Sequence, residues 1–387
     1  MGRARARRMP LRVGFDARKI DDFGIGTHIR GLLGALVGQA GLREVPELVV
    51  YLPPGRRSPI PDDPGRVVEW REEAARPYSL TELWRLAWRA RQDEVTLFHA
   101  PHYVCPPVLP CPAVVTIHDL IHLRLPVRHR HPLAPLYARV MLRLAVRRAA
   151  RLIAVSESTR QDLEARLRAP LGKIRVIPNG VDPIFGPSPA GATPDRALAT
   201  LGLVPPYYLF VGNPLPHKNL PRLLDAFGGL PPALGSLALV GVPDRMRATA
   251  RSWCQARGLE ARVTVLAPVP TETMPAIYRG ALALVCPSLW EGFGLPALEA
   301  LACGTPVLAS DRGALPEVVG SAGLLVDPTN VDALREGMYT LGVHASLRAA
   351  FREAGLARAR AFSWDHTAEA TLAVYREAWW GAGDAGD

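Results

Sequence analysis

Two glutamates on either side of a glycine turn, Glu291 and Glu299, form the chemically most informative stretch of the chain. The turn contains Gly292 and Gly294, and Pro296 stands where the first turn of a helix would begin. Amides at a helix start have no partner within the helix, and glycines allow close approach, so this stretch suits a diphosphate. Two acids beside an anion would repel it unless they bind something else, such as sugar or ribose hydroxyls. The stretch points to a nucleotide sugar; the alternative is an ordinary strand–turn–helix connection with surface glutamates.

A proline-stiffened loop, residues 212–219, carries a second group of candidate residues. It follows an apolar run and ends in one of the three lysines of the chain, Lys218. This lysine can neutralise a departing diphosphate, and Asn213 and His217 can donate hydrogen bonds to it. The alternative is a solvated loop, in which Asn219 caps the helix that follows.

His118 and Asp119 stand next to each other at the end of another apolar run. Neighbouring side chains on a strand point to opposite sides of the sheet, so we expect His118 to face the substrate and Asp119 to anchor the loop. A structural histidine is the alternative, because histidine is common nearby, at positions 99, 102 and 122. No pair of these histidines has the helical spacing of a metal site, and we expect no metal.

Gly24 and Gly26 are expected to form a loop before a helix, where their amides can contact a phosphate. Their similarity to a dinucleotide fingerprint is loose. Further along, residues 131–151 combine apolar positions at helical spacing with Arg139, Arg143 and Arg147, four residues apart. Two interpretations of this helix stay open: contact with an anionic membrane, or packing on the core with a solvated arginine face.

Two series of short apolar runs alternate with helical patterns and predict an α/β protein with two doubly wound, Rossmann-like domains. Such domains bind ligands at the carboxyl ends of their strands. The predicted limits are an N-terminal domain at 9–185, a proline-rich linker at 186–206, a C-terminal domain at 207–362 and a final helix at 363–380. The expected strands lie near residues 11–17, 48–52, 95–99, 113–119, 152–156 and 173–178, and then 207–212, 237–241, 263–266, 281–285, 306–309 and 323–326.

Composition agrees with a two-domain globular protein of 387 residues, with 48% hydrophobic and 21% charged residues. The basic N-terminus lacks an apolar signal-peptide core, and the five cysteines show no paired spacing, so we expect a cytoplasmic protein with reduced thiols. A net charge of +10 would suit nucleic acid, anionic membranes or phosphate-bearing substrates. Arginine-rich compositional bias gives the same charge, and we expect no nucleic-acid partner.

The Glu291–Glu299 segment resembles the signature of retaining glycosyltransferases of family four, which have the GT-B fold. The similarity extends over residues 11–375. Further stretches similar to that family follow in the right order: Gly24-Ile-Gly-Thr-His, His118-Asp-Leu, Ala154-Val-Ser-Glu-Ser-Thr, Ile177-Pro-Asn-Gly-Val-Asp and Val211-Gly-Asn-Pro-Leu-Pro-His-Lys-Asn.

The resemblance implies a role for each candidate residue. Glu299 would bind the donor ribose, Glu291 would hold sugar hydroxyls, and Lys218 would neutralise the leaving nucleoside diphosphate. His118 would lie near the donor sugar. The backbone would supply the remaining donor contacts, at Gly24 and Gly26 over the phosphates and at Gly292, Phe293, Gly294 and Leu295 beneath the sugar and diphosphate. Members usually transfer with retention and need no metal, and this chain contains no Asp-x-Asp.

One position departs from the family pattern. Many members place an arginine where this chain has Asn213, so either His217 contributes beside Lys218 or phosphate neutralisation is weaker.

The sequence as a whole therefore predicts a retaining hexosyltransferase with a glycan or lipid-linked acceptor. The resemblance favours mannose from GDP-mannose, and UDP-sugar donors stay open. A nucleotide-sugar epimerase of similar build and a catalytically idle binding subunit are the alternatives. Acceptor choice is expected to depend on loops near residues 70–110 and 119–135, which include Trp84, Trp88, His102 and Tyr103.

Overall fold

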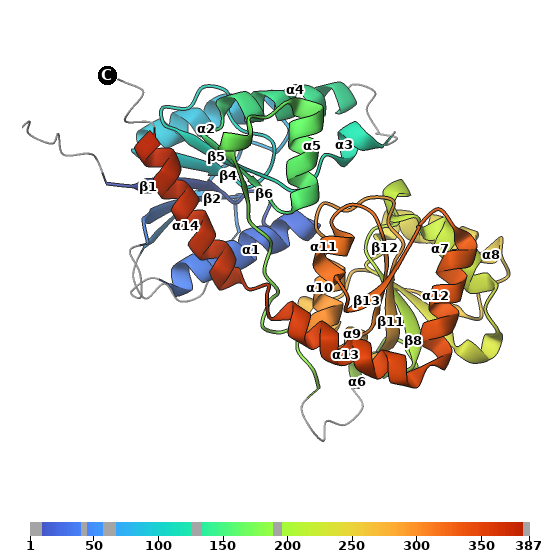
Figure 1. Cartoon of the computed structure of the whole chain (residues 1–387). Coiled ribbons are helices and arrows are strands. Elements are labelled where there is room, and N and C mark those ends of the chain that lie inside the picture. Colours follow the sequence, from blue (N-terminus) through green and yellow to red (C-terminus); the bar gives the residue numbers. More distant parts are fainter. Residues whose placement is uncertain (1–9, 40–44, 57–66, 126–133, 189–195, 382–387) are drawn as a thin grey trace, which may run out of the picture. The chain divides into compact units, whose positions relative to one another are not determined.

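The computed structural model describes residues 10–39, 45–56, 67–125, 134–188 and 196–381. The chain forms two compact units, one of residues 1–180 with 364–387 and the other of Val181–Ser363 (Figure 1). At the start of the second unit, the Val181 amide donates to the Phe362 carbonyl of the same unit. The segment predicted as a linker contains a short helix, α6 (Arg196–Thr200), with Leu198 and Leu203 buried.

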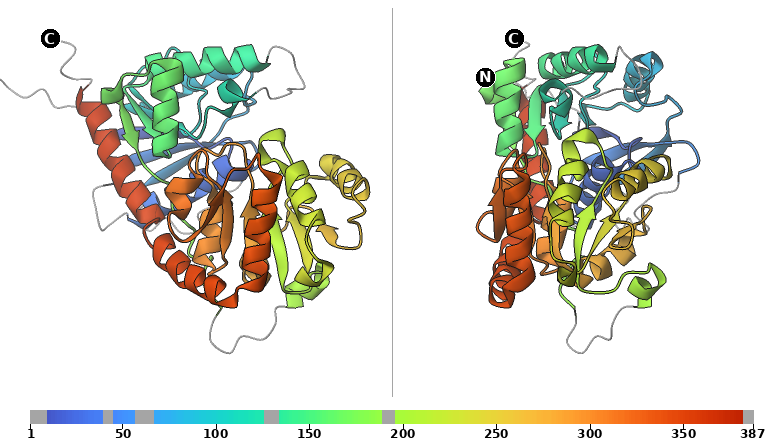
Figure 2. Two further views of the ribbon diagram at one scale, coloured as in Figure 1. Left: turned by 45° about the vertical axis from the view of Figure 1, so that its right-hand side comes forward. Right: turned by 90° about the vertical axis from the view of Figure 1, so that its right-hand side faces the viewer.

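The first unit contains a parallel sheet of seven strands in the order β3-β2-β1-β4-β5-β6-β7. The five inner strands are buried on both faces, as the apolar runs predict. Helices α1 (Phe23–Gly38) and α14 (Trp364–Gly381) cover one face, and α2 (Leu80–Gln92), α4 (Ala134–Arg148) and α5 (Glu157–Leu167) cover the other (Figures 1 and 2). The strands are β1 (Arg12–Asp16), β2 (Glu47–Leu52), β3 (Val68–Glu72), β4 (Leu97–Ala100), β5 (Ala113–Ile117), β6 (Arg151–Ala154) and β7 (Ile174–Val176).

Strand β3 was not expected from the sequence. It reads Val-Glu-Trp-Arg-Glu, without the apolar run that marks the other strands, and none of its residues is fully buried. It pairs only with β2, at the edge of the sheet, where charged side chains are tolerated and discourage pairing with other chains.

The second unit contains a parallel sheet of six strands in the order β10-β9-β8-β11-β12-β13. All six strands form where the sequence predicts them. They are β8 (Tyr207–Val211), β9 (Ser236–Val240), β10 (Val263–Val265), β11 (Ala281–Cys286), β12 (Val307–Ser310) and β13 (Gly323–Val326). The helices, other than α6, are α7 (Leu220–Gly228), α8 (Asp244–Gln255), α9 (Met274–Gly280), α10 (Leu295–Ala302), α11 (Leu315–Val319), α12 (Val331–Val343) and α13 (Ala345–Ala359).

In both sheets the strand order reverses at one point. The chain first builds outward on one side and then crosses to the other, so β1 lies beside β4 and β8 lies beside β11. In doubly wound sheets, the crevice beyond the carboxyl ends of such a strand pair is the usual ligand site. The loops after β1, β4, β8 and β11 are therefore the candidate ligand-binding loops.

The cysteines and the helix lengths can be described for this structure. All five cysteines are free, and four of them are buried. No described helix has both the length and the apolar character needed to cross a bilayer.

Candidate active site

The switch point of the second sheet brings Lys218 and Glu291 together. Lys218 ends the short 3-10 helix Pro216–Lys218 after β8, and Glu291 follows β11. The Lys218 Nζ donates a 2.6 Å hydrogen bond to Glu291 Oε1, and the two side chains are 18% and 14% exposed. The buried Ser288 hydroxyl donates to the same oxygen at 2.6 Å.

This arrangement keeps Glu291 ionised. Burial alone would raise the pKa of Glu291, but the charge of Lys218 and hydrogen bonds from Lys218 and Ser288 outweigh it, so the pKa is lowered. A smaller contribution in the same direction comes from His217. The site thus holds a carboxylate and an ammonium side by side at neutral pH.

The loop that carries Lys218 is held by Asn219. Its side chain does not cap α7, as the alternative interpretation of this loop would require; Asn219 has a left-handed backbone with φ 59° and is 2% exposed. Its Nδ2 donates to the carbonyls of Pro287, after β11, and Pro328, after β13, at 3.0 and 2.7 Å. The Leu289 amide also donates to the His217 carbonyl at 2.7 Å. Three loops are therefore joined around the base of Lys218.

The glycine turn before α10 has the predicted form. Gly294 precedes the helix with φ 103°, a conformation that favours glycine, and Pro296 lies in the first turn. A Cβ on Gly294 would also lie 2.7 Å from the side chain of Leu315. Pro296 has no amide hydrogen, and the amides of Ala297 and Leu298 bond to the Gly294 carbonyl. The Gly294 and Leu295 amides, which precede Pro296, are thus suited to contact an anion.

Glu291 is supported from behind by the loop after β12. The Ala314 amide donates to the Glu291 carbonyl at 3.0 Å. Gly313 has φ 66°, and a Cβ there would lie 2.6 Å from the same carbonyl oxygen. Only glycine fits here without moving the backbone of Glu291.

Glu299 lies within α10 and is held by Tyr278 from α9. The Tyr278 hydroxyl donates to Glu299 Oε2 at 2.6 Å. Burial raises the pKa of Glu299 to about 7, although the Tyr278 hydrogen bond acts in the opposite direction. Burial also raises the pKa of Tyr278 well above its ordinary value, so its hydroxyl stays protonated as the donor. Sequence reasoning did not find Tyr278, because no local pattern links it to Glu299.

The other residues of the second unit that were predicted to bind the donor differ in the groups that they can offer to a ligand. Leu295 is the first residue of α10. Phe293 is 7% exposed and packs edge-on against Phe362, so only its backbone can serve a ligand. Asn213 lies in the loop before Lys218, and its Oδ1 is buried without a hydrogen-bond partner among the described residues.

In the first unit, His118 follows β5 directly. Its Nε2 lies 2.8 Å from the Pro101 carbonyl, which can only accept, so Nε2 carries the proton and Nδ1 is the acceptor nitrogen. Burial lowers the pKa of His118, which keeps the ring neutral. Asp119 anchors the loop as predicted, because its Oδ1 accepts from the Ile121 amide at the start of a short helix.

His118 contacts a second histidine that sequence reasoning did not select. The ring of His28, in α1, lies edge-on to His118 with centroids 4.8 Å apart. His28 Nδ1 lies 2.8 Å from the Asn179 side-chain oxygen, which joins the segment after Gly26 to the segment after β7. A nearby histidine, His99, has a structural role: it is fully buried, and its ring nitrogens are hydrogen-bonded to the hydroxyls of Tyr375 and Thr116.

Gly24 and Gly26 do not form a loop. Both lie in the first turn of α1, and the Gly26 amide already donates to the Asp22 carbonyl at 2.7 Å. A Cβ on Gly26 would lie 2.3 Å from the Ile20 carbonyl oxygen, so this glycine is required by packing. Gly24, one position nearer the helix start, is the better placed of the two to offer an amide to a phosphate.

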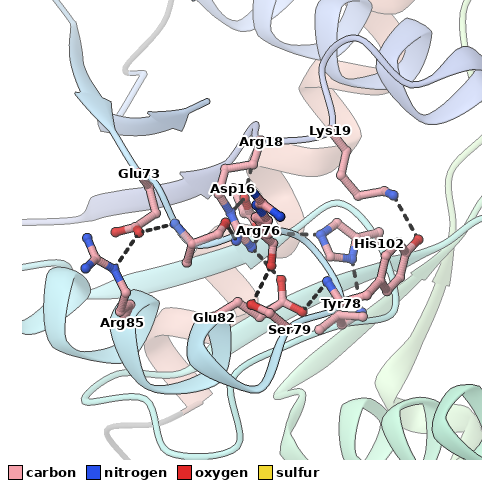
Figure 3. Close-up of polar contacts among 12 residues, drawn as sticks. Asp16, Arg18, Lys19, Glu73, Arg76, Tyr78, Ser79, Glu82, Arg85 and His102 are labelled. Carbon is pink, nitrogen blue, oxygen red and sulfur yellow. Dashed lines mark hydrogen bonds and ion pairs between the residues drawn. The ribbon is translucent and has the colours of Figure 1, made fainter. Parts of the chain in front are cut away.

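The switch point of the first sheet is filled by a buried charge network (Figure 3). Asp16 at the end of β1 and Glu82 in α2 both accept from the guanidinium of Arg18, and both carboxylates are fully buried. His102, after β4, approaches Asp16 at 3.3 Å. Burial would raise the pKa of Asp16, but the charge and hydrogen bonds of Arg18 lower it strongly. The network ties α2 to the centre of the sheet. His102 lies in the loop after β4, as expected, but it is buried there, with 1% of its surface exposed.

No group of three or more His, Cys, Asp or Glu side chains is placed to hold a metal ion in the part of the chain that the structure describes.

Comparisons with known proteins match both units. A family model described as "Glycosyl transferases group 1" matches residues 200–358, and one described as "Glycosyltransferase Family 4" matches residues 24–185. Over 316 residues the chain is 32% identical to the O-antigen chain mannosyltransferase B of Escherichia coli, covering 77% of this chain and 79% of that protein.

Solved structures agree with the fold. The sucrose-phosphate synthase of Thermosynechococcus elongatus superposes with a TM-score of 0.78 at 23% identity, covering 95% of this chain and 98% of that one. Anabaena HepE, crystallised with UDP-glucose, gives a TM-score of 0.72 at 20% identity over 94% and 99% of the two chains. Together with the family models and the Escherichia coli relative, these matches show that the chain belongs to glycosyltransferase family 4 and has the GT-B fold.

Proposed function

We propose that this glycosyltransferase moves a hexose from a nucleotide sugar to a glycan or lipid-linked acceptor, with retention and without a metal ion. The observation that carries the proposal is the Lys218–Glu291 pair beside the glycine turn of α10. Two adjacent loops of the second unit thereby offer a cation for the diphosphate and a carboxylate for sugar hydroxyls. Amides for the phosphate oxygens lie in the same turn.

Each acid then has a separate task. Glu299, held by Tyr278, binds the ribose hydroxyls of the nucleotide. Lys218 and Ser288 both donate to Oε1 of Glu291, so a sugar hydroxyl would donate to Oε2. When the donor binds, Lys218 exchanges part of its contact with Glu291 for the diphosphate.

The proposed reaction needs no side chain as a base. The bond between the anomeric carbon and the phosphate oxygen breaks, and the acceptor oxygen bonds to that carbon on the same face. The acceptor proton passes to the departing phosphate oxygen, and Lys218 stabilises the negative charge that develops there. His118 acts as a neutral hydrogen-bond partner for the donor sugar, through Nδ1, because its Nε2 is already bonded to Pro101.

We propose GDP-mannose as the donor. The supporting observations are the mannosyltransferase among the relatives and the His118-Asp-Leu and Asn213–Asn219 segments. A UDP-sugar is the second candidate, favoured by the UDP-glucose complex of the structurally similar Anabaena HepE. A cytoplasmic protein acting at the inner face of a membrane completes the proposal, since a lipid-linked acceptor would be found there and α4 carries the predicted arginine row.

The test is to incubate the protein with labelled GDP-mannose and UDP-sugars, with and without acceptor and with a metal chelator. We expect nucleoside diphosphate to appear only with acceptor, at a rate that the chelator does not change. NMR of the product should show the anomeric configuration of the donor. A changed sugar on an intact nucleotide would instead identify an epimerase, and binding without turnover an idle subunit.

A further inference from the structure

The side of the first unit formed by α2 and α4 exposes an unusual set of side chains. On α2, Leu80, Trp84 and Trp88 recur every four residues and so form one row along the helix. They are 74%, 66% and 54% exposed, although large apolar side chains of soluble domains are mostly buried. Leu136 and Val140 of α4 are exposed in the same way.

The two helices present these side chains to the same side. Both pack on one core beneath the same face of the first sheet, with Leu86 from α2 and Leu142 from α4. Leu83 of α2 and Met141 of α4 belong to one further apolar cluster between them. The views of Figures 1 and 2 agree that α2 and α4 cover this face, opposite α1 and α14. We call the solvent side of both helices the α2–α4 surface.

The exposed charge of this surface is positive. Glu82 is the one acid within the two helices, and it is buried in the charge network. Arg139, Arg143 and Arg147 are exposed along α4, and Arg91 is exposed at the end of α2. Two other arginines of α2, Arg85 and Arg89, pair with the buried Glu73.

The position of α2 is fixed from within. Glu82 accepts from Arg18 through Oε2 and from the Tyr78 amide through Oε1, at 2.9 and 2.7 Å (Figure 3). The tryptophan row is therefore carried by a helix that is anchored to the sheet and need not refold to be presented.

We propose that the α2–α4 surface docks the enzyme on an anionic lipid bilayer, with Trp84 and Trp88 entering the interface and the α4 arginines contacting lipid headgroups. Tryptophan prefers the boundary between headgroups and hydrocarbon, and arginine is attracted to acidic lipids. Exposed apolar side chains on two helices whose exposed charged side chains are all arginines match that partner by charge complementarity. The proposal deepens the proposed function by naming the surface behind the membrane contact. Vesicle binding needs no turnover, so it can fail while the transferase activity stands.

The test is co-sedimentation of the full chain with vesicles of phosphatidylcholine alone and of equal parts phosphatidylcholine and phosphatidylglycerol. We expect binding to the anionic vesicles, weakened by salt. The double variant Trp84→Ser/Trp88→Ser should bind at least tenfold more weakly. Arg139→Gln/Arg143→Gln should lose the preference for phosphatidylglycerol.

Matched controls are available elsewhere on the chain. Trp380→Ser removes a tryptophan of α14 that is also 54% exposed, and Arg245→Gln/Arg251→Gln removes two exposed arginines of α8. Both should leave binding unchanged. Equal loss in the controls, or full binding by the Trp84→Ser/Trp88→Ser variant, would overturn the proposal.

Two further readouts distinguish other occupants. If the tryptophan variant raised the KM for a soluble acceptor but bound vesicles normally, the row would be an acceptor contact instead. If it only converted a dimer to monomers in light scattering, the surface would belong to a second copy of the chain.

Discussion

Lys218 Nζ lies 2.6 Å from Glu291 Oε1, although 73 residues separate the two side chains along the chain. They meet because the loops after β8 and β11 lie next to each other at the reversal of strand order. The pair keeps both side chains charged, so the site does not have to ionise when a donor binds. In the proposed function a diphosphate would compete with Glu291 for the ammonium group, which would couple the recognition of the phosphates to that of the sugar.

Replacing Lys218 tests this coupling. We expect Lys218→Ala to lower kcat/KM by about 100- to 1000-fold, because the developing charge on the diphosphate loses its cation. Glu291→Gln should lower it as well. The double variant should be little worse than Lys218→Ala alone, since residues that act as a unit are not additive. The measurement is kcat/KM of the three variants by steady-state kinetics. A near-native value for Lys218→Ala would show that Lys218 does not stabilise the departing diphosphate.

The hydrogen bond from Tyr278 to Glu299 predicts a change in the pH dependence of donor binding. Glu299 accepts ribose hydroxyls best when ionised, so the KM for the donor should fall as the pH rises through about 7. Tyr278→Phe removes a contact that lowers the pKa of Glu299, so the midpoint should move to higher pH. A donor analogue that lacks ribose hydroxyls should show neither effect. An unchanged midpoint in Tyr278→Phe would contradict this role for the tyrosine.

Glu299 also predicts how stability depends on pH without a ligand. Burial raises the pKa of Glu299 from its ordinary 4.5 to about 7, so the folded state binds the proton more tightly than the unfolded state. The resulting stability is fully present below pH 4.5 and is lost as the pH rises through about 7. Comparing Glu299→Gln with the parent chain isolates this contribution. The Tm difference between them should change in favour of the variant between pH 5 and pH 8, and a constant difference would show that Glu299 does not titrate there.

We expect replacement of Asn219 to lower both the stability of the fold and the activity. Asn219→Gly keeps the left-handed backbone conformation but removes two buried hydrogen bonds, to Pro287 and Pro328. We expect a loss of about 2–4 kcal/mol in the free energy of unfolding, measured by urea denaturation. The kcat should fall too, because the loop that carries Lys218 loses its support. Asn219→Ala should be less stable still, since alanine disfavours φ 59°. Stability equal to the parent chain would show that these bonds contribute nothing.

Much of this architecture could be predicted from the sequence, because apolar periodicity reports directly on buried strands. All six strands of the second sheet and the turn from Gly292 to Pro296 were located this way. The edge strand β3 was not predicted because three of its five side chains are charged. Gly24 and Gly26 were misplaced because glycine is compatible with both a loop and the first turn of a helix, and close packing against Ile20 decided between them.

The contacts that position the site could not be predicted in the same way. Tyr278 and Asn219 act on residues brought near by the sheet, and only the strand order makes them neighbours. The charge network of the first unit is a similar case. Asp16 and His102 are 86 residues apart, and nothing in either local sequence indicates the other.

Asn219 also has a mechanical consequence. Its side chain donates to the carbonyls of Pro287, after β11, and Pro328, after β13. Strand β13 is an edge strand of the second sheet, and local opening is usually easiest at an edge. Because the same side chain holds the loop of Lys218, we expect the edge strand and this loop to open together. If β13 opens, Asn219 would lose its hydrogen bond to the Pro328 carbonyl, and the loop of Lys218 would lose part of its support. The rigidity of Lys218 would therefore depend on the edge strand of the second sheet.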